Sequence, residues 1–265
     1  MDEIKYFEKV AEYKLLAKHE VGQNFLVDPM VARKIVDLAE INAEDKVLEI
    51  GSGAGSLSFF IEQQATNADL IDIDEGLIQK ITEDFKDSKN LKIQLGNAMK
   101  WDYAPYTKII SNLPYYITSA ILERILLTAT NMKKGVFMVQ KEVVSRLNAP
   151  VGNDNYGPLS ILIKHRAKFT KGFVVSRNFF VPAPHIESSV FVLDIINNNA
   201  KEAEELYSLC NAMFLHKRKT ILNNLGSYLK DNEKAKEVLA KAKIPENKRP
   251  QEMSLDMYLS LLKCL

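Results

Sequence analysis

The sequence predicts an α/β fold, in which a largely parallel sheet with helices on both faces and an antiparallel edge is followed by a small all-helical unit. Three observations support this prediction. From about residue 46 to residue 140, short apolar runs of strand length alternate with segments of helical spacing, a pattern typical of parallel sheets. Two later apolar runs follow one another without a clear helix between them. Beyond residue 196 only helical patterns occur.

The elements follow in order along the chain. In the segment 75–85, Leu77, Ile78, Ile81 and Phe85 recur at helical spacing. The N-terminal residues are charged and also predict a helix, without the apolar core of a signal peptide. The predicted parallel strands are 46–50, 68–74, 91–95, 108–110 and 135–140, the edge strands are 167–175 and 188–195, and the helices between parallel strands are 55–64, 75–85 and 118–129.

A domain boundary is predicted near residue 196. The chain has 265 residues, which fits one large domain with a smaller appendage. Residues 196–205, INNNAKEAEE, are poor in apolar residues and rich in asparagine, as a linker would be. We therefore expect one domain over residues 1–195 and a helical domain over residues 196–265.

Composition excludes several classes of protein. With 46% hydrophobic and 26% charged residues, the chain resembles ordinary soluble globular proteins, and no apolar run approaches the roughly 18 residues that span a bilayer. Cys210 and Cys264 form no CxxC pair, so we expect a reducing compartment, the cytoplasm, and no disulfide framework. The four histidines show no ligand spacing, so no metal site is predicted. Because no apolar run is long enough to span a bilayer, no membrane partner is predicted either.

Charge is unevenly distributed although the net charge is only +1. Residues 37–102 hold 14 Asp and Glu against 6 Lys and Arg, whereas residues 141–180 hold 7 Lys and Arg against 2 Asp and Glu. Further basic clusters lie at 216–219 (HKRK) and 241–249. This uneven distribution of charge is typical of a protein with a basic face that binds a polyanion. The same side chains could also simply lie on solvated faces of helices.

A glycine-rich turn follows the first predicted strand. The stretch LEIGSGAGSLS (48–58) places Glu49, Gly51, Gly53 and Gly55 at the strand end, where glycine lets the backbone approach a ligand and the next helix offers free N–H groups. Ser56 stands where the dinucleotide fingerprint needs glycine, which disfavours a nicotinamide-dependent oxidoreductase. The form E-x-G-x-G-x-G is instead that of S-adenosylmethionine enzymes, so these four residues are candidate cofactor contacts.

Two further strand ends carry candidate cofactor contacts. Asp72 ends the neighbouring strand, and a carboxylate there can accept the hydroxyls of a ribose. Ile73 would then lie against the adenine, while Asp74 is better placed to cap the following helix. Asn97 follows the third strand and could meet the adenine amino group, although asparagine at such a position is often only a turn former.

The stretch SNLPYYIT (111–118) ends the fourth strand and suits transfer of a methyl group to the exocyclic amine of a base. That nitrogen is a poor nucleophile because its lone pair is delocalised into the ring. The side-chain oxygen of Asn112 and the carbonyl of Leu113 could accept its two N–H groups, and Pro114 fixes the backbone. Tyr115 would offer a face on which an extruded base stacks. Tyr116 could be either a packing residue or the lip of the site.

These motifs together resemble a known family. E-x-G-x-G-x-G with N-L-P-Y is similar to class I N6-adenine and N4-cytosine methyltransferases. VGQNFLVD (21–28) and FFVPAPHIESSVFVL (179–193) resemble the rRNA adenine N6,N6-dimethyltransferases, the KsgA-like family, as do residues 141–160 and 216–225. The matching motifs occur in the family's order over about residues 20–225. The resemblance implies a Rossmann-like methyltransferase domain followed along the chain by a helical RNA-binding domain.

The resemblance implies roles for individual residues. Asn24 and Leu26 match cofactor-contacting positions, as do Gly51, Asp72 and Asn112, and Asn97 falls where the family usually has Asp. Asn112, Leu113, Pro114 and Tyr115 match the catalytic loop, and Phe180 matches an aromatic residue that sandwiches the target base opposite Tyr115. Ser58 replaces a frequent Thr, Pro158 a common Arg and His185 a common Lys.

The implied substrate is a pair of adjacent adenosines in a hairpin near the 3′ end of small-subunit rRNA, within a pre-30S-type particle bound by a monomer. S-adenosylmethionine is the implied cofactor. Residues expected to meet RNA phosphates are Arg146, Lys164, Arg166, Lys168, Lys217, Arg218 and Lys219. Two alternatives stay open: an Erm-like methyltransferase of large-subunit rRNA, and a non-catalytic RNA-binding assembly factor that has kept the fold.

Overall fold

The computed structural model describes residues 2–13 and 23–265, except for the side chain of Tyr115. The first two residues of the motif at 21–28 therefore lie outside the described residues. The chain divides into two compact units, one of residues 1–144 and 169–195 and the other of residues 145–168 and 196–265. Residues 145–168, which the sequence analysis assigned to the first domain, group with the C-terminal helices.

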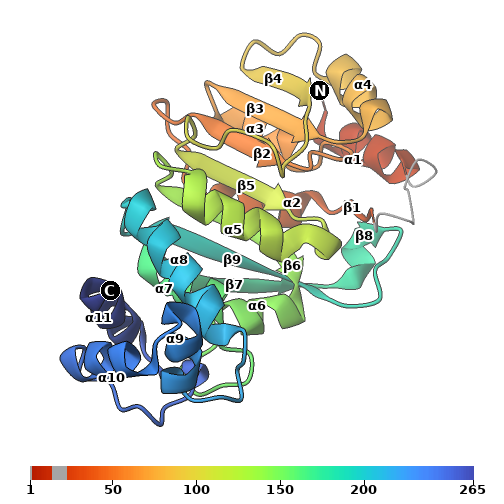
Figure 1. The fold of residues 1–265 in the computed structure, drawn as a ribbon. Coiled ribbons are helices and arrows are strands. Elements are labelled where there is room, and N and C mark those ends of the chain that lie inside the picture. Colours follow the sequence, from red (N-terminus) through yellow and green to blue (C-terminus); the bar gives the residue numbers. More distant parts are fainter. Residues whose placement is uncertain (1, 14–22) are drawn as a thin grey trace. The chain divides into compact units, whose positions relative to one another are not determined.

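The first unit is built on a seven-stranded sheet in the order β4-β3-β2-β5-β6-β9-β7 (Figure 1). Neighbours from β4 to β6 pair in parallel, and β6 pairs with β9 in antiparallel register, Val136 opposite Val192. The predicted parallel sheet with an antiparallel edge is thus confirmed. The strands are β2 (Val47–Ile50), β3 (Ala68–Asp72), β4 (Leu91–Leu95), β5 (Lys108–Asn112), β6 (Lys134–Gln140), β7 (Ala167–Val175) and β9 (Ser188–Ile195).

A second, two-stranded sheet was not predicted. It pairs β1 (Phe25–Leu26) with β8 (Phe180–Val181) in antiparallel register, Leu26 opposite Phe180. Strands of two residues carry too little alternation to be recognised from sequence. This pair ties the chain before the first helix to the segment that precedes β9.

Helices cover both faces of the large sheet. Residues of α1 (Glu3–Glu12), α2 (Pro29–Asp37) and α3 (Ser58–Gln64) share one apolar core with strand residues such as Ile110 and Val136. In Figure 1, α2 lies behind the sheet and α5 (Thr118–Thr128) in front of it. Strands β2 and β3 are buried along their whole length, as expected for central parallel strands covered on both sides.

The remaining helices of the first unit begin where the sequence analysis predicted caps and strand ends. Helix α4 (Glu75–Asp84) begins after Asp74, whose carboxylate accepts hydrogen bonds from the Gly76 and Leu77 amides at 3.0 and 3.4 Å. The predicted cap is therefore confirmed. Helix α6 (Lys141–Leu147) follows β6 directly.

The second unit is helical. Its elements are α7 (Pro158–Arg166), α8 (Ala200–Phe214), α9 (Ile221–Leu229), α10 (Asn232–Lys241), the short η5 (Pro250–Glu252) and α11 (Leu255–Cys264). They enclose a separate apolar core that includes Tyr156, Leu209, Leu225 and Tyr258. None of the helices in the described ranges is long and apolar enough to cross a membrane.

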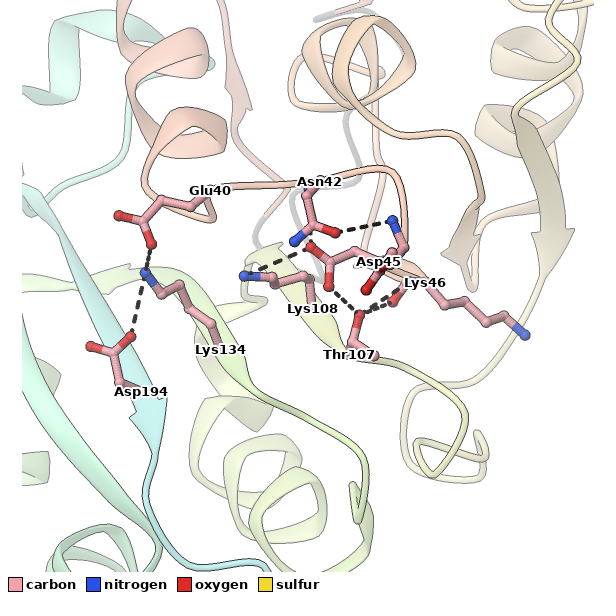
Figure 2. A network of polar contacts seen from close by, with 9 residues as sticks. Glu40, Asn42, Asp45, Lys46, Thr107, Lys108, Lys134 and Asp194 are labelled. Carbon is pink, nitrogen blue, oxygen red and sulfur yellow. Dashed lines mark hydrogen bonds and ion pairs between the residues drawn. The ribbon is translucent and has the colours of Figure 1, made fainter.

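The amino-terminal edge of the large sheet carries a network of charged and polar side chains (Figure 2). Asp45 is central to it, since its carboxylate accepts hydrogen bonds from the Asn42 amide at 3.0 Å and the Thr107 hydroxyl at 2.8 Å. The Lys108 ammonium, on a side chain that is 8% exposed, lies 3.8 Å from Asp45. Lys134, at the start of β6, pairs with Glu40 and Asp194. This network joins the loop after α2 to the starts of β2, β5 and β6.

Asp45→Asn is expected to lower the free energy of unfolding by about 3–5 kcal/mol, because it leaves the Lys108 cation buried without its partner. Chemical denaturation measures the loss, and Lys86→Met, which removes one side of an exposed ion pair with Glu83, should change little. The double variant Asp45→Asn/Lys108→Met should recover much of the loss. Equal losses in the single and double variants would contradict the ion pair as the cause.

Candidate functional site

A pocket opens at the carboxyl edge of the sheet, opposite the network of Figure 2. It encloses about 1040 Å³, counting the space open to solvent. Its walls come from residues 23–26 at β1, 49–54, 56 and 57 around the end of β2, 71–73 and 96–98 at the ends of β3 and β4, and 112–114, 116, 117 and 121 from the end of β5 onward. All of these segments belong to the first unit. The parallel strands therefore bring together most of the residues that the sequence analysis singled out.

The glycine-rich turn forms the floor of this pocket. Gly51 and Gly53 both line it and have φ angles of 68° and 54°, a conformation that side-chain-bearing residues rarely adopt. The Gly51 amide donates to the Ile71 carbonyl at 2.8 Å, and the Gly53 amide donates to the Asp72 carboxylate at 2.9 Å. The turn is thereby fixed to the end of β3.

Gly55 has a different role from the predicted cofactor contact. It does not line the pocket, and its φ is 83°. A Cβ at this position would lie 2.2 Å from the Tyr6 hydroxyl. That hydroxyl donates to the Ala54 and Gly55 carbonyls at 3.3 and 3.2 Å. The glycine at 55 therefore makes room for helix α1, which packs against the turn.

Asp72 and Ile73 lie where the sequence analysis placed them. Both line the pocket; Asp72 is 8% exposed and Ile73 is 65% exposed. One Asp72 oxygen accepts from the Gly53 amide and the other from the Asp74 amide, at 2.9 Å each. Each carboxylate oxygen keeps further acceptor capacity. Burial raises the pKa of this carboxyl, and the hydrogen bonds from the two amides oppose that shift.

Asn97 lines the pocket but is already engaged. Its side-chain oxygen accepts a hydrogen bond from the Met99 amide at 2.8 Å. The turn-forming role that asparagine often takes is therefore present here together with the pocket position. Because the Asn97 oxygen is already engaged, the side-chain amide nitrogen is the group that can donate a hydrogen bond to a ligand.

The loop after β5 brings Asn112 to the pocket wall together with Leu113 and Pro114. The Asn112 amide nitrogen donates to the Asn24 carbonyl at 3.5 Å, whereas its Oδ1 is buried and has no hydrogen-bond partner among the described residues. Pro114 precedes a short turn, η3 (Tyr115–Ile117), and its carbonyl accepts from the Ile117 amide at 3.3 Å and the Thr118 hydroxyl at 2.9 Å. The side chain of Tyr115 lies outside what the structure describes.

Two unpaired polar atoms mark this pocket as a site for a polar ligand. Among the described residues, five buried side-chain nitrogen or oxygen atoms lack a partner, and two of them, Ser52 Oγ and Asn112 Oδ1, belong to residues that line the pocket. A buried unpaired polar atom costs about 1–3 kcal/mol. Together with the open backbone at Gly51 and the carboxylate of Asp72, these atoms fit a nucleoside-bearing cofactor. No group of three or more His, Cys, Asp or Glu residues that could hold a metal occurs within residues 2–13 and 23–265.

Glu49 is the most strongly perturbed carboxyl of the pocket. It is 1% exposed, and the Ser58 hydroxyl donates to its Oε2 at 2.5 Å. Burial raises the pKa of Glu49 to about 8, although the Ser58 hydrogen bond opposes the shift. In the absence of a ligand this group therefore holds a proton at neutral pH.

Phe180 does not reach the pocket. It is 2% exposed and belongs to the apolar core beneath α1 and α2, because its position in β8 opposite Leu26 turns it inward. The sequence analysis expected this ring to stack on the target base. The preceding residue, Phe179, is instead 36% exposed.

The predicted RNA-binding cations separate into two groups. Arg166 is fully buried and donates to the Asn197 carbonyl, so it holds the second unit together and cannot reach phosphate. Lys164 is half-buried and donates to the Ala149 carbonyl, and burial lowers the pKa of both groups. Lys217 is half-buried and donates to the Asp154 carbonyl. Those that are exposed are Arg146, Lys168, Arg218 and Lys219.

Comparison with known proteins decides the family. A family model described as ribosomal RNA adenine dimethylase matches residues 15–265. The chain belongs to this family. Ribosomal RNA small subunit methyltransferase A of Malacoplasma penetrans is 34% identical, with 98% of this chain and 96% of that protein covered. The protein of the same name from Streptococcus gordonii is also 34% identical, with 94% and 91% covered.

Solved structures agree with this membership. A dimethyladenosine transferase from Plasmodium falciparum matches with a TM-score of 0.77 and 28% identity, over 88% of this chain and 94% of that one. The 23S rRNA methyltransferase ErmE matches with a TM-score of 0.69 over 91% and 99% of the two chains, but at 20% identity. The second likeness shows a shared fold. The predicted Rossmann-like methyltransferase fold and the predicted family are both confirmed.

Several pocket residues were not predicted from the sequence. They include Gln23, Ser52, Ile117 and Ile121. Ser52 stands inside the glycine motif at a position where any residue is permitted. Ile117 ends the turn η3, and Ile121 fits the apolar face of α5. A signal for Ser52 exists only in the structure, as a buried hydroxyl without a partner.

Gly55→Ala should destabilise the protein more than Gly152→Ala. Both residues have φ near 84° (83° and 84°), but a Cβ at Gly152 meets nothing within 4 Å. The backbone cost of about 1–2 kcal/mol is common to both, and the clash with Tyr6 adds about 1–3 kcal/mol to the first. Thermal unfolding checks the difference, and Tyr6→Phe should relieve part of it. Equal losses for the two alanine variants would refute the packing role of Gly55.

Glu49→Gln should change how stability depends on pH. Because the pKa of Glu49 in the folded protein, about 8, lies above the ordinary 4.5, the folded state keeps a proton that the unfolded chain loses. The contribution of Glu49 to the free energy of unfolding therefore falls as pH rises from about 4.5 to 8. Without ligand, the variant should gain stability over the wild type across this window, on the order of a few kcal/mol. Urea unfolding at several pH values checks this, and parallel pH profiles would contradict it.

Proposed function

We propose that this chain transfers methyl groups from S-adenosylmethionine to N6 of two adjacent adenosines in a hairpin near the 3′ end of small-subunit rRNA, giving N6,N6-dimethyladenosine. The proposal rests on one observation above all: the buried, unpaired Oδ1 of Asn112, a residue of the pocket wall at the carboxyl ends of the parallel strands. It is supported by family membership and by relatives named as small-subunit methyltransferases. The partner is a pre-30S-type particle bound by a monomer in the cytoplasm.

The cofactor would lie along the carboxyl edge of β2, β3 and β4. Asp72 would accept the ribose hydroxyls with its remaining lone pairs, Ile73 would cover the adenine, and Asn97 would contact the adenine edge. The open backbone at Gly51 and Gly53 lets the ligand approach closely. When bound, S-adenosylmethionine supplies an electrophilic methyl group on a sulfonium.

Asn112 and Leu113 would prepare the acceptor nitrogen. The Asn112 oxygen and the Leu113 carbonyl accept the two N–H groups of the adenine, which draws that nitrogen toward tetrahedral geometry and frees its lone pair. Pro114 holds the carbonyl in place through the turn that follows it. Because the methyl donor is already reactive, positioning contributes more than a strong base would. Tyr115 is the proposed stacking face for the extruded base.

Contacts to RNA would come from exposed cations. Arg146, Lys168, Arg218 and Lys219 are exposed and are the proposed phosphate contacts. The affinity should fall as salt rises, because the gain from releasing counterions into solution becomes smaller. Arg166 is excluded from this role by its burial. Sequence preference would arise from unstacked loop bases, since the major groove of an RNA helix is too narrow to read.

The decisive experiment maps methylated adenosines by mass spectrometry after incubation with unmethylated small and large subunits and cofactor. The wild type should dimethylate two adjacent adenosines of small-subunit rRNA. Asn112→Ala should abolish transfer while cofactor affinity, measured by titration, stays within a few-fold. Asn131→Ala is the matched control, because that side chain bonds the Ala104 carbonyl outside the pocket.

Each other outcome identifies a different error. Methylation of large-subunit rRNA would favour the Erm-like alternative. Tight binding to small subunits without any transfer would favour a non-catalytic assembly factor. Full turnover by Asn112→Ala would refute the assigned role of that side chain and leave the enzyme class untouched.

A further inference from the structure

The first unit has two exposed aromatic residues among those whose side chains the structure describes, Tyr116 and Phe179. Tyr116 is 61% exposed and Phe179 is 36% exposed. All other described aromatic side chains of this unit are buried or half-buried. An aromatic ring left in water forgoes the stabilisation that burial gives its neighbours. Tyr116 lines the pocket, and Phe179 adjoins β8, whose partner strand β1 lines it, so both exposed rings are placed where a bound ligand could cover them.

Tyr116 stands on the wall that follows β5. It lines the pocket, and among the described residues its side chain has no hydrogen-bond partner and no aromatic neighbour. The backbone that carries it is fixed, because the Pro114 carbonyl accepts from both the Ile117 amide and the Thr118 hydroxyl. The exposed Tyr116 ring is therefore attached to a backbone that hydrogen bonds hold in place.

Phe179 does not itself line the pocket, but it directly precedes β8, the strand that pairs with β1. Its carbonyl accepts from the Val27 amide at 2.8 Å, and the next residue, Phe180, pairs with Leu26, which lines the pocket. Phe179 ends the short turn η4 (Arg177–Phe179), whose backbone is closed by a bond of 3.1 Å from the Phe179 amide to the Ser176 carbonyl. Because Phe180 anchors this strand in the core, Phe179 is held at the surface.

Basic residues lie near Phe179 along the chain. Arg177 is exposed two residues before it, and His185 is exposed on the loop that leads from β8 to β9. Lys141, the first residue of α6, is paired with Glu187 at 2.9 Å. Exposed rings interleaved with cations are the surface that single-stranded nucleic acid binds, through stacking and phosphate contacts.

We infer that Tyr116 and Phe179 stack on the unpaired bases that flank the target adenosine. This inference rests on the proposed function. An adenosine that leaves its stack to enter the pocket exposes the faces of its neighbours, and loop bases of RNA are held by such aromatic platforms. Tyr116 lines the pocket, and Phe179 adjoins the strand that pairs with Phe25 and Leu26 of the pocket wall, so the two rings can hold the strand on either side of the inserted nucleotide.

The test uses the full chain, unmethylated small subunits and steady-state kinetics. Tyr116→Leu and Phe179→Leu keep apolar surface but remove the ring, whereas Tyr116→Phe and Phe179→Trp keep a ring. Each leucine variant should raise KM for the subunit roughly 5- to 150-fold, the loss of one base stack, with kcat changed far less. Ile4→Ala, which alters a residue of α1 that is 70% exposed, should leave KM unchanged.

Cofactor titration shows whether the Tyr116 ring contacts the RNA or the cofactor. An unchanged cofactor dissociation constant together with a raised KM for the subunit supports the inference, as does near wild-type KM in the ring-keeping variants. A weaker cofactor affinity in Tyr116→Leu would overturn it, because the ring would then belong to the cofactor pocket. Leucine variants with wild-type KM would also overturn it while the proposed function stands. A wild type that methylates nothing would overturn both.

Discussion

Parallel pairing of β2 with β3 and β5 is the constraint on which the site depends. Because all three strands run the same way, the glycine turn, Asp72 and Asn112 must meet at one edge, although 19 residues separate Gly53 from Asp72 and 40 separate Asp72 from Asn112. The hydrogen bond from the Gly53 amide to Asp72 then fixes the turn to its neighbour. Without this pairing, no local sequence feature would bring a backbone cradle, a carboxylate and an amide to one ligand.

Buried polar groups have hydrogen-bond partners at the amino-terminal edge of the sheet, whereas some of them lack partners at the carboxyl edge. At the amino-terminal edge, Asp45 has a hydroxyl, an amide and an ammonium as partners, and the network is closed. At the carboxyl edge, Ser52 and Asn112 keep buried oxygen atoms without partners. Satisfied networks stabilise a fold, whereas unpaired buried groups lower its stability. The first edge is therefore suited to stability and the second to binding.

Sequence patterns predicted the large sheet well, because its strands are continuous apolar runs and its helices have clear periodicity. They also located Glu49, Gly51, Asp72 and Asn112, since turn glycines and strand-end polar residues are visible in a sequence. They could not assign Gly55, Phe180 and Arg166 correctly. Glycine at 55 serves a contact with Tyr6, 49 residues away, and the burial of Phe180 and Arg166 follows from tertiary pairing with β1 and with the segment after β9. Motif matching identifies a residue type but carries no information on which way its side chain faces.

An unpaired acceptor is meaningful only if the protein could have avoided it. Asn112 already donates to the Asn24 carbonyl through its amide nitrogen, while its buried Oδ1 has no partner among the described residues. A leucine in its place would have buried an apolar group without the penalty of about 1–3 kcal/mol for an unsatisfied oxygen. The proposed function gives this oxygen a donor that arrives with the ligand, since an exocyclic amine offers two. The unpaired Asn112 oxygen lowers the stability of the fold. A bound purine amino group would give this oxygen a hydrogen-bond donor, so substrate binding would remove that energetic cost.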